Sequence, residues 1–323
     1  ATPLLNPTLR RPINKMHKDE ILIDIKLVRQ LVDNQFPQFT NLPLQRLPAS
    51  GSTNVQFRLG DELLVRLPRL AGGGQDIEKE AHWTPIMGKH LPVAVPEFVG
   101  VGQPAFGDSE QWLIVRWLDG EHPRVCNPTD LPHVKRSQLA NDLANVILAL
   151  RAVAVPQEAS TEPNLQNYRG RSLEAYDKPM RRNIEQCRSI PGLNLDLDAA
   201  LFLWENTLEL TSGYVAGDAR WYHCDLVAEN LLLTDNRLSG VLDFGGLAVG
   251  DPTIDLHGAW ELFDPPAREV FRVKVGATEV EWRRGRAWAL AVALMTFPYY
   301  WNTLPSRVKD RLAMAQSVLA EAE

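Results

Sequence analysis

The segment WYHCDLVAENLLL, residues 221–233, constrains the fold of this chain more than any other stretch. It places His223, Asp225 and Asn230 within eight residues, and Asn230 leads directly into an apolar run that is typical of a β-strand. A turn at DNR then leads into a second run, LSGVLDF, which ends near Asp243. Two short apolar runs on either side of a tight turn predict a β-hairpin.

An antiparallel hairpin brings Asn230, at the start of its first strand, beside Asp243, at the end of its second, with the Cα atoms about 5 Å apart. A carboxylate and an amide oxygen facing one point suit Mg²⁺, which phosphates and water would complete. Asp225 lies in the loop that enters the hairpin, where it suits a base that orients a hydroxyl group. The spacing His-x-Asp-x₄-Asn, followed by DFG, matches phosphoryl transfer. A polar loop beside an ordinary hairpin is the competing interpretation.

Hydrophobic periodicity divides the rest of the chain into two parts. The first part, residues 16–118, is rich in strands, with alternating patterns in NVQFRLG, ELLVRLP, PEFVGVGQP and QWLIVRWL and with helical patterns at 23–36 and after the three glycines. The second part, residues 119–323, is mostly helical, with patterns at 135–153, 196–210, 281–301 and 306–322. We therefore predict an α+β, two-lobed fold with a hinge near 116–120. Residues 1–15 are interpreted as a leader or extension.

Three motifs, HCDLVAEN, VLDFGG and GDPTIDLHGAW, together resemble the aminoglycoside phosphotransferase family, the small-molecule branch of the protein-kinase-like fold. STNVQFRLGDELLVRLPR, IEKEAHW and VRWLDGE are similar to the small lobe and hinge of that family. The likeness runs from about Met16 to the C-terminus, and the motifs in the second half are the more specific. It implies a small, β-rich, nucleotide-binding N-lobe at 16–118 and a larger helical C-lobe at 119–323 that holds the catalytic loop, the metal site and the acceptor pocket.

The resemblance implies a role for each matching residue. Asp225 would be the catalytic base, while Asn230 and Asp243 would hold Mg²⁺. His223 would brace the catalytic loop, and Asp255 would steady it through hydrogen bonds. The adenine edge of ATP would meet the hinge backbone at Arg116, Trp117 and Leu118.

Two departures from the family pattern concern the nucleotide phosphates. No GxGxxG motif is present, and SGSTN at 50–54 supplies the hydroxyl groups of Ser52 and Thr53 instead, although a plain hairpin turn is the alternative. The lysine expected on the third strand is replaced by Arg66, whose guanidinium can bind phosphate oxygens in a bidentate manner. Its expected ionic partner is Glu80 on the following helix, with Glu78 as the competitor.

Bulk composition limits the partners. The net charge of −6 argues against a nucleic-acid binder, and the absence of any run of 18 apolar residues argues against a membrane span. Three distant cysteines, without a signal-peptide pattern at the start, indicate a reducing, cytoplasmic setting and no zinc site. We expect a monomer or a dimer.

The resulting hypothesis is ATP-dependent transfer of a phosphoryl group to a hydroxyl of a small, cationic molecule, such as an aminoglycoside-like antibiotic. A kinase of a macrolide, choline, a sugar amine or homoserine is the alternative, as is a nucleotide-binding pseudokinase. Carboxylates that could attract an ammonium group are Glu229, Glu261 and Asp264, and the segment FPYYWNT at 297–303 could form an aromatic wall. ATP and GTP are not distinguished by the sequence.

Overall fold

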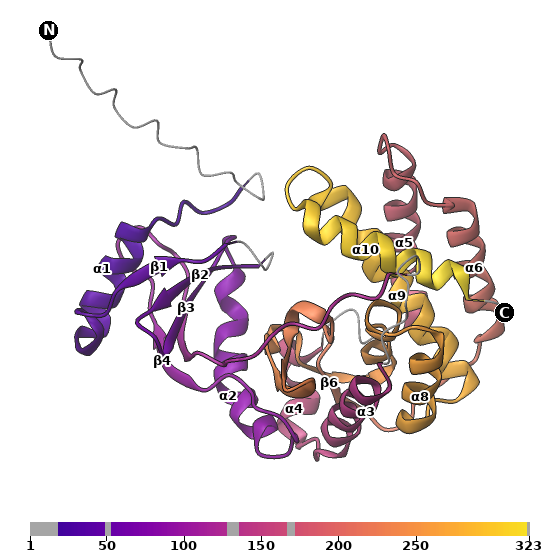
Figure 1. Cartoon of the computed structure of the whole chain (residues 1–323), viewed down its shortest axis with the longest axis horizontal. Helices are drawn as coiled ribbons and strands as arrows, with labels where there is room; N and C mark the ends of the chain where they lie inside the picture. The colour runs from indigo at the N-terminus through magenta and orange to yellow at the C-terminus, as the bar shows by residue number, and fades with distance from the viewer. Residues whose placement is uncertain (1–18, 49–52, 128–135, 167–171, 322–323) are drawn as a thin grey trace, which may run out of the picture.

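The computed structural model describes residues 19–48, 53–127, 136–166 and 172–321. Within these ranges the chain forms a small lobe built around a sheet and a larger lobe built mostly from helices, which lie side by side in Figure 1. This arrangement confirms the α+β, two-lobed fold. The segment interpreted as a leader, 1–15, lies outside the described residues.

The small lobe contains a five-stranded antiparallel sheet in the order β1-β2-β3-β5-β4. Its strands are β1 (Leu44–Arg46), β2 (Asn54–Leu59), β3 (Leu63–Pro68), β4 (Phe98–Gly102) and β5 (Trp112–Arg116). Gly60, with φ at +60°, turns β2 into β3, as the Gly-Asp pair predicts. Two helices, α1 (Ile25–Gln35) and α2 (Ile77–Gly88), flank the sheet on opposite faces (Figure 1).

The side chains of β3 point alternately to the two faces of the sheet. Val65 and Leu67 pack with α1 in a fully buried apolar cluster, whereas Leu64 packs on the opposite side with Ile77 of α2. Because successive side chains of a strand point to opposite faces, Arg66 shares the α2 face with Leu64. The strand pattern therefore directs one cation away from the apolar cluster and toward the space between the lobes.

The chain leaves β5 through residues 117–120, which form no regular element, and enters the helical lobe. The helices of this lobe are α3 (Ser137–Ala152), α4 (Gln157–Thr161), α5 (Leu173–Arg188), α6 (Leu197–Leu210), α7 (Ala259–Leu262), α8 (Pro265–Val275), α9 (Glu279–Tyr300) and α10 (Pro305–Ala320). The central helix is α9, which packs against α5, α6 and α10 and is buried over most of its length. Thr278 and Glu281 close its N-terminus with a capping box.

Two short strand pairs are embedded in the helical lobe. They are β6 (Arg220–Tyr222) with β9 (Ala248–Gly250), and β7 (Leu231–Thr234) with β8 (Arg237–Val241). The predicted hairpin is therefore present. Its turn residues Asp235 and Asn236 have φ values of +51° and +61°, which two-residue hairpin loops require and which these residue types tolerate.

Helix α5 is absent from the sequence-based expectation. Its apolar positions, Leu173, Tyr176, Met180 and Ile184, have helical spacing and are buried, and Ser172 caps its N-terminus by accepting a hydrogen bond from Ala175. Pro179 lies inside the helix, and a proline ordinarily argues against a helix interior. The apolar spacing thus indicated a helix, but Pro179 argued against it.

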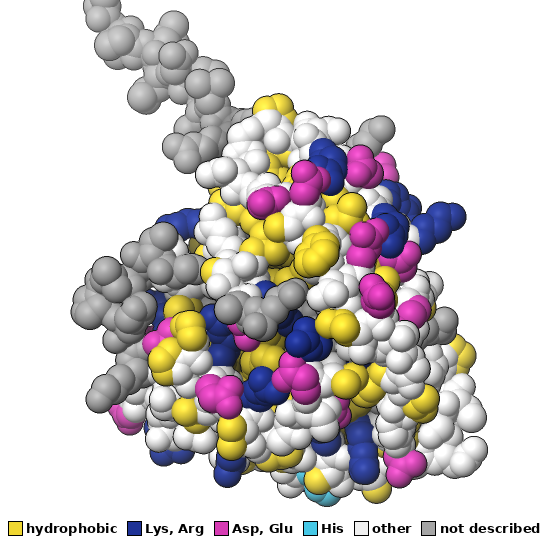
Figure 2. Space-filling view, turned by 90° about the vertical axis from the view of Figure 1, so that its right-hand side faces the viewer, with side chains coloured by type: hydrophobic (Ala, Val, Ile, Leu, Met, Phe, Trp, Pro, Cys, Tyr) yellow, Lys and Arg dark blue, Asp and Glu magenta, His cyan; other side chains and the backbone are white. Residues whose placement is uncertain are grey.

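No helix among the described residues is long and apolar enough to cross a lipid bilayer. On the face drawn in Figure 2, acidic and basic side chains are interspersed with hydrophobic ones.

Candidate active site

The β7–β8 hairpin brings Asn230 and Asp243 to the same end. The amide N–H of Leu242 donates to the carbonyl oxygen of Asn230 at 2.8 Å, which aligns the two chains one position before Asp243. Both residues lie just outside the strands: Asn230 ends the 3-10 turn Ala228–Asn230, and Asp243 caps the N-terminus of the 3-10 turn Phe244–Gly246. The spacing argument from the sequence therefore predicted this juxtaposition correctly.

Asp225 and Asn230 are joined directly. The side-chain amide nitrogen of Asn230 donates to the carbonyl oxygen and to the carboxylate Oδ2 of Asp225, both at 2.9 Å. Since the nitrogen of the planar amide makes both contacts, the amide oxygen of Asn230 points away from Asp225. Both side chains line the large cavity described below.

A buried carboxylate holds the loop before Asp225 in an unusual conformation. Asp255, which is 1% exposed, accepts hydrogen bonds from the backbone N–H groups of His223 at 2.8 Å and of Cys224 at 2.7 Å. Cys224 has a φ of +82°, which costs a non-glycine residue energy. Burial raises the pKa of Asp255, while the two backbone N–H groups oppose that shift. The two hydrogen bonds thus help to retain the strained Cys224.

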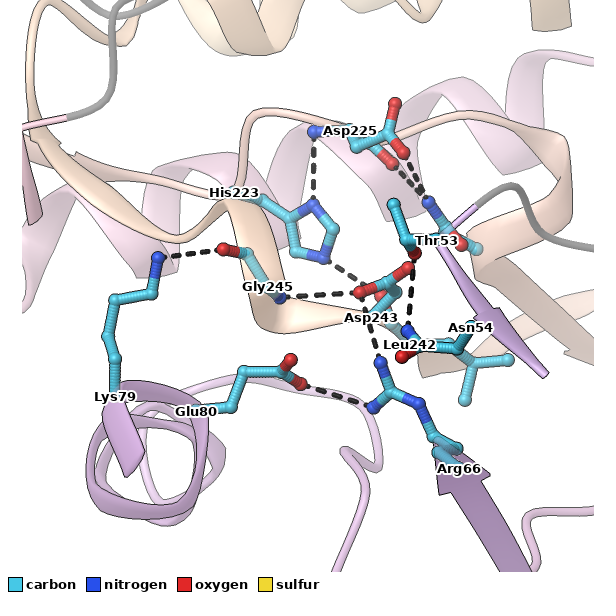
Figure 3. A network of polar contacts seen from close by, with 11 residues as sticks. Thr53, Asn54, Arg66, Lys79, Glu80, His223, Asp225, Leu242, Asp243 and Gly245 are labelled. Carbon is cyan, nitrogen blue, oxygen red and sulfur yellow. Dashed lines mark hydrogen bonds and ion pairs between the residues drawn. The ribbon is translucent and has the colours of Figure 1, made fainter. Parts of the chain in front are cut away.

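His223 supports the same loop through its ring. Its Nδ1 accepts from the N–H of Asp225 at 3.2 Å, and its Nε2 lies 2.9 Å from the carbonyl oxygen of Leu242 (Figure 3). The neutral tautomer with the proton on Nε2 satisfies both contacts. The ring therefore links the loop that carries Asp225 to the strand end that carries Asp243.

Asp243 and Arg66 connect the two lobes. Asp243 has a φ of +56°, and its Oδ1 accepts from the N–H of Gly245 at 3.3 Å and from Nη2 of Arg66 at 3.4 Å. The other arm of Arg66 pairs with Glu80 at 3.1 Å (Figure 3). Glu78 is exposed and instead accepts from Gln111, so Glu80 is the partner, as expected. Although burial opposes the charged guanidinium, Glu80 and Asp243 raise the pKa of Arg66.

Lys79, beside Glu80, was missed by sequence reasoning. It is 4% exposed and donates to the carbonyl oxygens of Gly245 at 2.7 Å and Asn164 at 3.3 Å. Figure 3 shows it reaching the Asp-Phe-Gly turn from α2. A lysine on the buried side of an amphipathic helix was the available signal, because buried lysines require partners.

A cavity of about 1240 Å³ lies between the lobes, and Arg66, Asp225, Asn230 and Asp243 of this network line it. Its sheet side is lined by Thr53, Gln56, Leu64, Arg66 and Val115, and its hinge side by Arg116, Trp117 and Leu118. Ser52 lies outside the described residues, so its expected contact with phosphate has no structural description. Thr53 is exposed, and its hydroxyl accepts from Asn54.

Two of the three hinge N–H groups are already engaged within the small lobe. The N–H of Arg116 donates to the carbonyl oxygen of Glu97 and that of Trp117 to Glu62, so neither N–H is available to a nucleotide base. The Arg116 side chain pairs with Glu97 on the outside, and the Trp117 ring stacks under Arg58. Leu118 is the hinge residue whose N–H has no backbone partner among the described residues.

The donor set fits a hard divalent cation. Among the described residues, no group of three or more histidine, cysteine, aspartate or glutamate side chains could hold a metal ion. Asn230 and Asp243 would supply two oxygen ligands at one end of the hairpin, and Mg²⁺ ordinarily takes few protein ligands and completes its shell with phosphate and water. The site is thus suited to a metal that arrives with a nucleotide.

The acceptor carboxylates expected from the sequence are not gathered in the cavity. Glu261 is 1% exposed, pairs with Arg311 and accepts from the N–H of Ala228. Asp264 instead caps α8 by accepting from the N–H of Ala267. Glu261 is therefore part of a buried ion pair, and Asp264 is a helix cap. Their closeness to the motifs in the sequence did not predict these roles.

Glu229 alone of the three expected acceptor carboxylates lines the cavity, and it is paired with Arg307 at 2.5 Å and with Arg311 at 3.5 Å. Burial raises its pKa to about 7 even though both arginines act against the shift. The expected aromatic segment contributes Pro298, Tyr299 and Tyr300 to the cavity, whereas Phe297 is fully buried.

Gly258 packs closely against the loop that carries Asp225. A Cβ atom at this position would lie 2.1 Å from the carbonyl oxygen of Leu226, the residue after Asp225. We expect Gly258→Ala to lower the free energy of unfolding by about 1–3 kcal/mol, as overpacking does, and to reduce turnover by displacing the loop. Chemical denaturation and steady-state kinetics measure both effects. Gly217→Ala, which meets no atom within 4 Å, is the control and should change neither.

The fold is shared with a known class of enzymes. The chain resembles solved structures of two-lobed, protein-kinase-like phosphotransferases. The GDP complex of wild-type aminoglycoside 2'-phosphotransferase-IIIa superposes with a TM-score of 0.69 at 17% identity, covering 92% of this chain and 99% of that one. The streptomycin-ATP complex of APH(2")-IIa gives 0.60 at 18% identity, with coverages of 91% and 99%. Macrolide 2'-phosphotransferase MphH from Brachybacterium faecium gives 0.57 at 19%, with 93% and 99%.

The family follows from the sequence match. A model of the phosphotransferase enzyme family matches residues 45–288, most of the chain. The protein therefore belongs to this family and is a phosphotransferase. No curated protein matches the sequence.

Proposed function

We propose that this protein transfers the γ-phosphoryl group of ATP, bound with Mg²⁺, to a hydroxyl group of a small molecule. The observation that carries the proposal is the arrangement of Asp225, Asn230 and Asp243, which lie close together and line one cavity between the lobes. Most pseudokinases lack at least one of these three groups. The presence of all three in this chain therefore disfavours a pseudokinase. The pair of Arg66 and Glu80 beside them supports a nucleotide site in the same cavity.

The proposed reaction needs a base, a donor and an open line of attack. The acceptor hydroxyl oxygen forms a bond to the γ-phosphorus, the bond from that phosphorus to the bridging oxygen breaks, and ADP leaves. The hydroxyl proton passes to the carboxylate of Asp225, whose position is fixed by Asn230 and by the His223 ring. Asp255 is a positioning residue, since it acts through the backbone of this loop.

Asn230 and Asp243 would hold Mg²⁺, which supplies neutralisation of the charge that develops on the phosphate oxygens. Arg66 lies beside Asp243 and would bind phosphate with the guanidinium arm that now reaches this carboxylate. The N–H of Leu118 would be the hinge donor for the base, and Thr53, which also lines the cavity, would bind phosphate. The choice of ATP is supported by relatives described as ADP-bound and ATP-bound, whereas others are described as GDP complexes.

The relatives support two classes of acceptor. An aminoglycoside-like antibiotic, the cationic acceptor expected from the sequence, is supported by structures described as kanamycin, streptomycin and gentamicin complexes. A macrolide is supported by the macrolide 2'-phosphotransferases. None of the described cysteines, Cys126, Cys187 and Cys224, forms a disulfide, which suits a reducing compartment such as the cytoplasm, where ATP is abundant.

A direct test measures transfer of γ-label from ATP, and separately from GTP, to aminoglycosides, macrolides, amino alcohols and hydroxy acids in the presence of Mg²⁺. We expect a labelled acceptor product that disappears when EDTA removes the metal. Label released only as inorganic phosphate, with no labelled acceptor in any class, would contradict the proposal.

A further inference from the structure

Beyond the catalytic loop, three helices of the C-lobe form the other half of the cavity. Tyr176 and Arg182 belong to α5, Met295 and Tyr299 to α9, and Arg307 to α10. Tyr299 is 69% exposed, so its ring is accessible from the cavity. This half, which we call the acceptor half, therefore offers both guanidinium groups and apolar surface to a molecule that enters it.

The carboxylates of the acceptor half are already engaged. Among the described residues that line it, the carboxylates are Asp225 and Glu229. Glu229 is held by Arg307 and Arg311, and Arg311 is also paired with the buried Glu261. An ammonium group would therefore have to displace a guanidinium before it could use Glu229, which makes this half a poor match for a polycation.

Arg182 is the cation of the acceptor half that is not neutralised. It is exposed, it lines the cavity, and no hydrogen bond or ion pair holds its side chain among the described residues. The acidic residues nearest to it on α5 are paired elsewhere, Asp177 with Arg181 and Glu185 with Arg188. A guanidinium in this situation is a ready partner for an anionic group of a ligand.

We propose that the acceptor is an anionic hydroxyl compound, whose carboxylate or phosphate pairs with Arg182 while its hydroxyl lies at Asp225. This inference rests on the proposed phosphoryl transfer and names its substrate class. A guanidinium binds such anionic oxygens in a bidentate manner, and a like-charged ammonium in the same place is repelled. Met295 and Tyr299 provide the apolar surface for the carbon skeleton between the two ends. The anion binds and orients the acceptor, and it takes no part in the bond changes.

The test uses sets of compounds that share one skeleton. ω-Hydroxy fatty acids of graded chain length are compared with their methyl esters, with the corresponding amino alcohols, and with the monophosphates of the matching diols. Aminoglycosides are included as polycations. We expect kcat/KM for the anions to exceed that of the esters and amines by about tenfold or more, mainly through KM, as a lost charged contact in binding predicts. The carboxylate and phosphate arms identify which anion is used.

Variants on α5 connect the preference to one residue. Arg182→Gln should abolish the advantage of the anion over the ester, and Arg182→Glu should shift the preference toward the amino alcohol. Arg188→Gln is the matched control, because Arg188 lies on the same helix but pairs with Glu185 and Asp198 outside the cavity. The control should retain the wild-type preference.

Calorimetric binding, with Mg²⁺ and a non-hydrolysable ATP analogue, separates this inference from the proposed function. Preferred turnover of amino alcohols or aminoglycosides, unaffected by Arg182→Gln, overturns the inference and leaves phosphoryl transfer intact. Anion binding that requires Arg182, without phosphorylation of any compound, supports the anion site and overturns the proposed transfer. If the anions are neither bound nor turned over, the inference is overturned.

Discussion

Replacement of Asp225 by Asn is expected to lower kcat by about 10²–10⁴-fold, the usual contribution of general base catalysis. The amide keeps the size of the carboxylate and a carbonyl oxygen that can still accept from Asn230 at the observed 2.9 Å, so the loop should retain its shape. It cannot take a proton from the acceptor. Nucleotide affinity should therefore be close to that of the wild type. Single-turnover kinetics and nucleotide titration measure the two quantities separately.

The matched control is Asp218→Asn, which makes the same chemical change at an exposed position of the same lobe. It should leave kcat unchanged. Wild-type turnover by Asp225→Asn would show that the carboxylate is not the base. A parallel loss of nucleotide affinity and of thermal stability would show instead that its role is structural.

The second large effect concerns stability. Arg66→Met should lower the free energy of unfolding by about 3–5 kcal/mol, because Glu80 would remain buried without its ionic partner. The sulfur-containing side chain fills most of the volume, so the loss reflects charge more than packing. Urea denaturation, followed by both fluorescence and circular dichroism, measures this change. Arg181→Met, at an exposed ion pair, is the control and should change stability by less than about 1 kcal/mol.

The double variant Arg66→Met/Glu80→Leu separates stability from function. Removing both charges should restore most of the lost stability, since a buried ion pair and an apolar pair of similar volume are often equivalent. Nucleotide affinity should stay low in the single and the double variant, because both lack the guanidinium beside Asp243. If the double variant regained tight nucleotide binding, Arg66 would have no part in holding phosphate.

Local patterns were sufficient for much of the fold. Alternation and turn residues placed β2, β3 and the β7–β8 hairpin, and helical spacing placed α1, α3, α6, α9 and α10. These elements follow from side-chain periodicity, which is a property of neighbouring residues. Helix α5 escaped because Pro179 contradicts the local rule, and packing against α6 and α9 compensates for it.

Some contacts of the candidate site could likewise be predicted from local sequence, and others could not. The spacing of Asp225, Asn230 and Asp243 was sufficient because a hairpin fixes which residues meet at its end. The pairing of Arg66 with Glu80 was also accessible, since β3 and α2 follow one another in the chain. Lys79 reaches Gly245 across a long stretch of sequence, and no local pattern indicates that contact.

The sequence by itself determined the two lobes, the meeting of Asn230 with Asp243 and the class of reaction, because each depends on residues close together in the chain or on one hairpin. The tertiary structure alone decided the character of the acceptor half. Arg182 on α5, Tyr299 on α9 and Arg307 on α10 are far apart in sequence and line one cavity only after α9 packs between its neighbours. The same packing buried Glu261 and paired Glu229 with arginines, since a buried charge requires a partner.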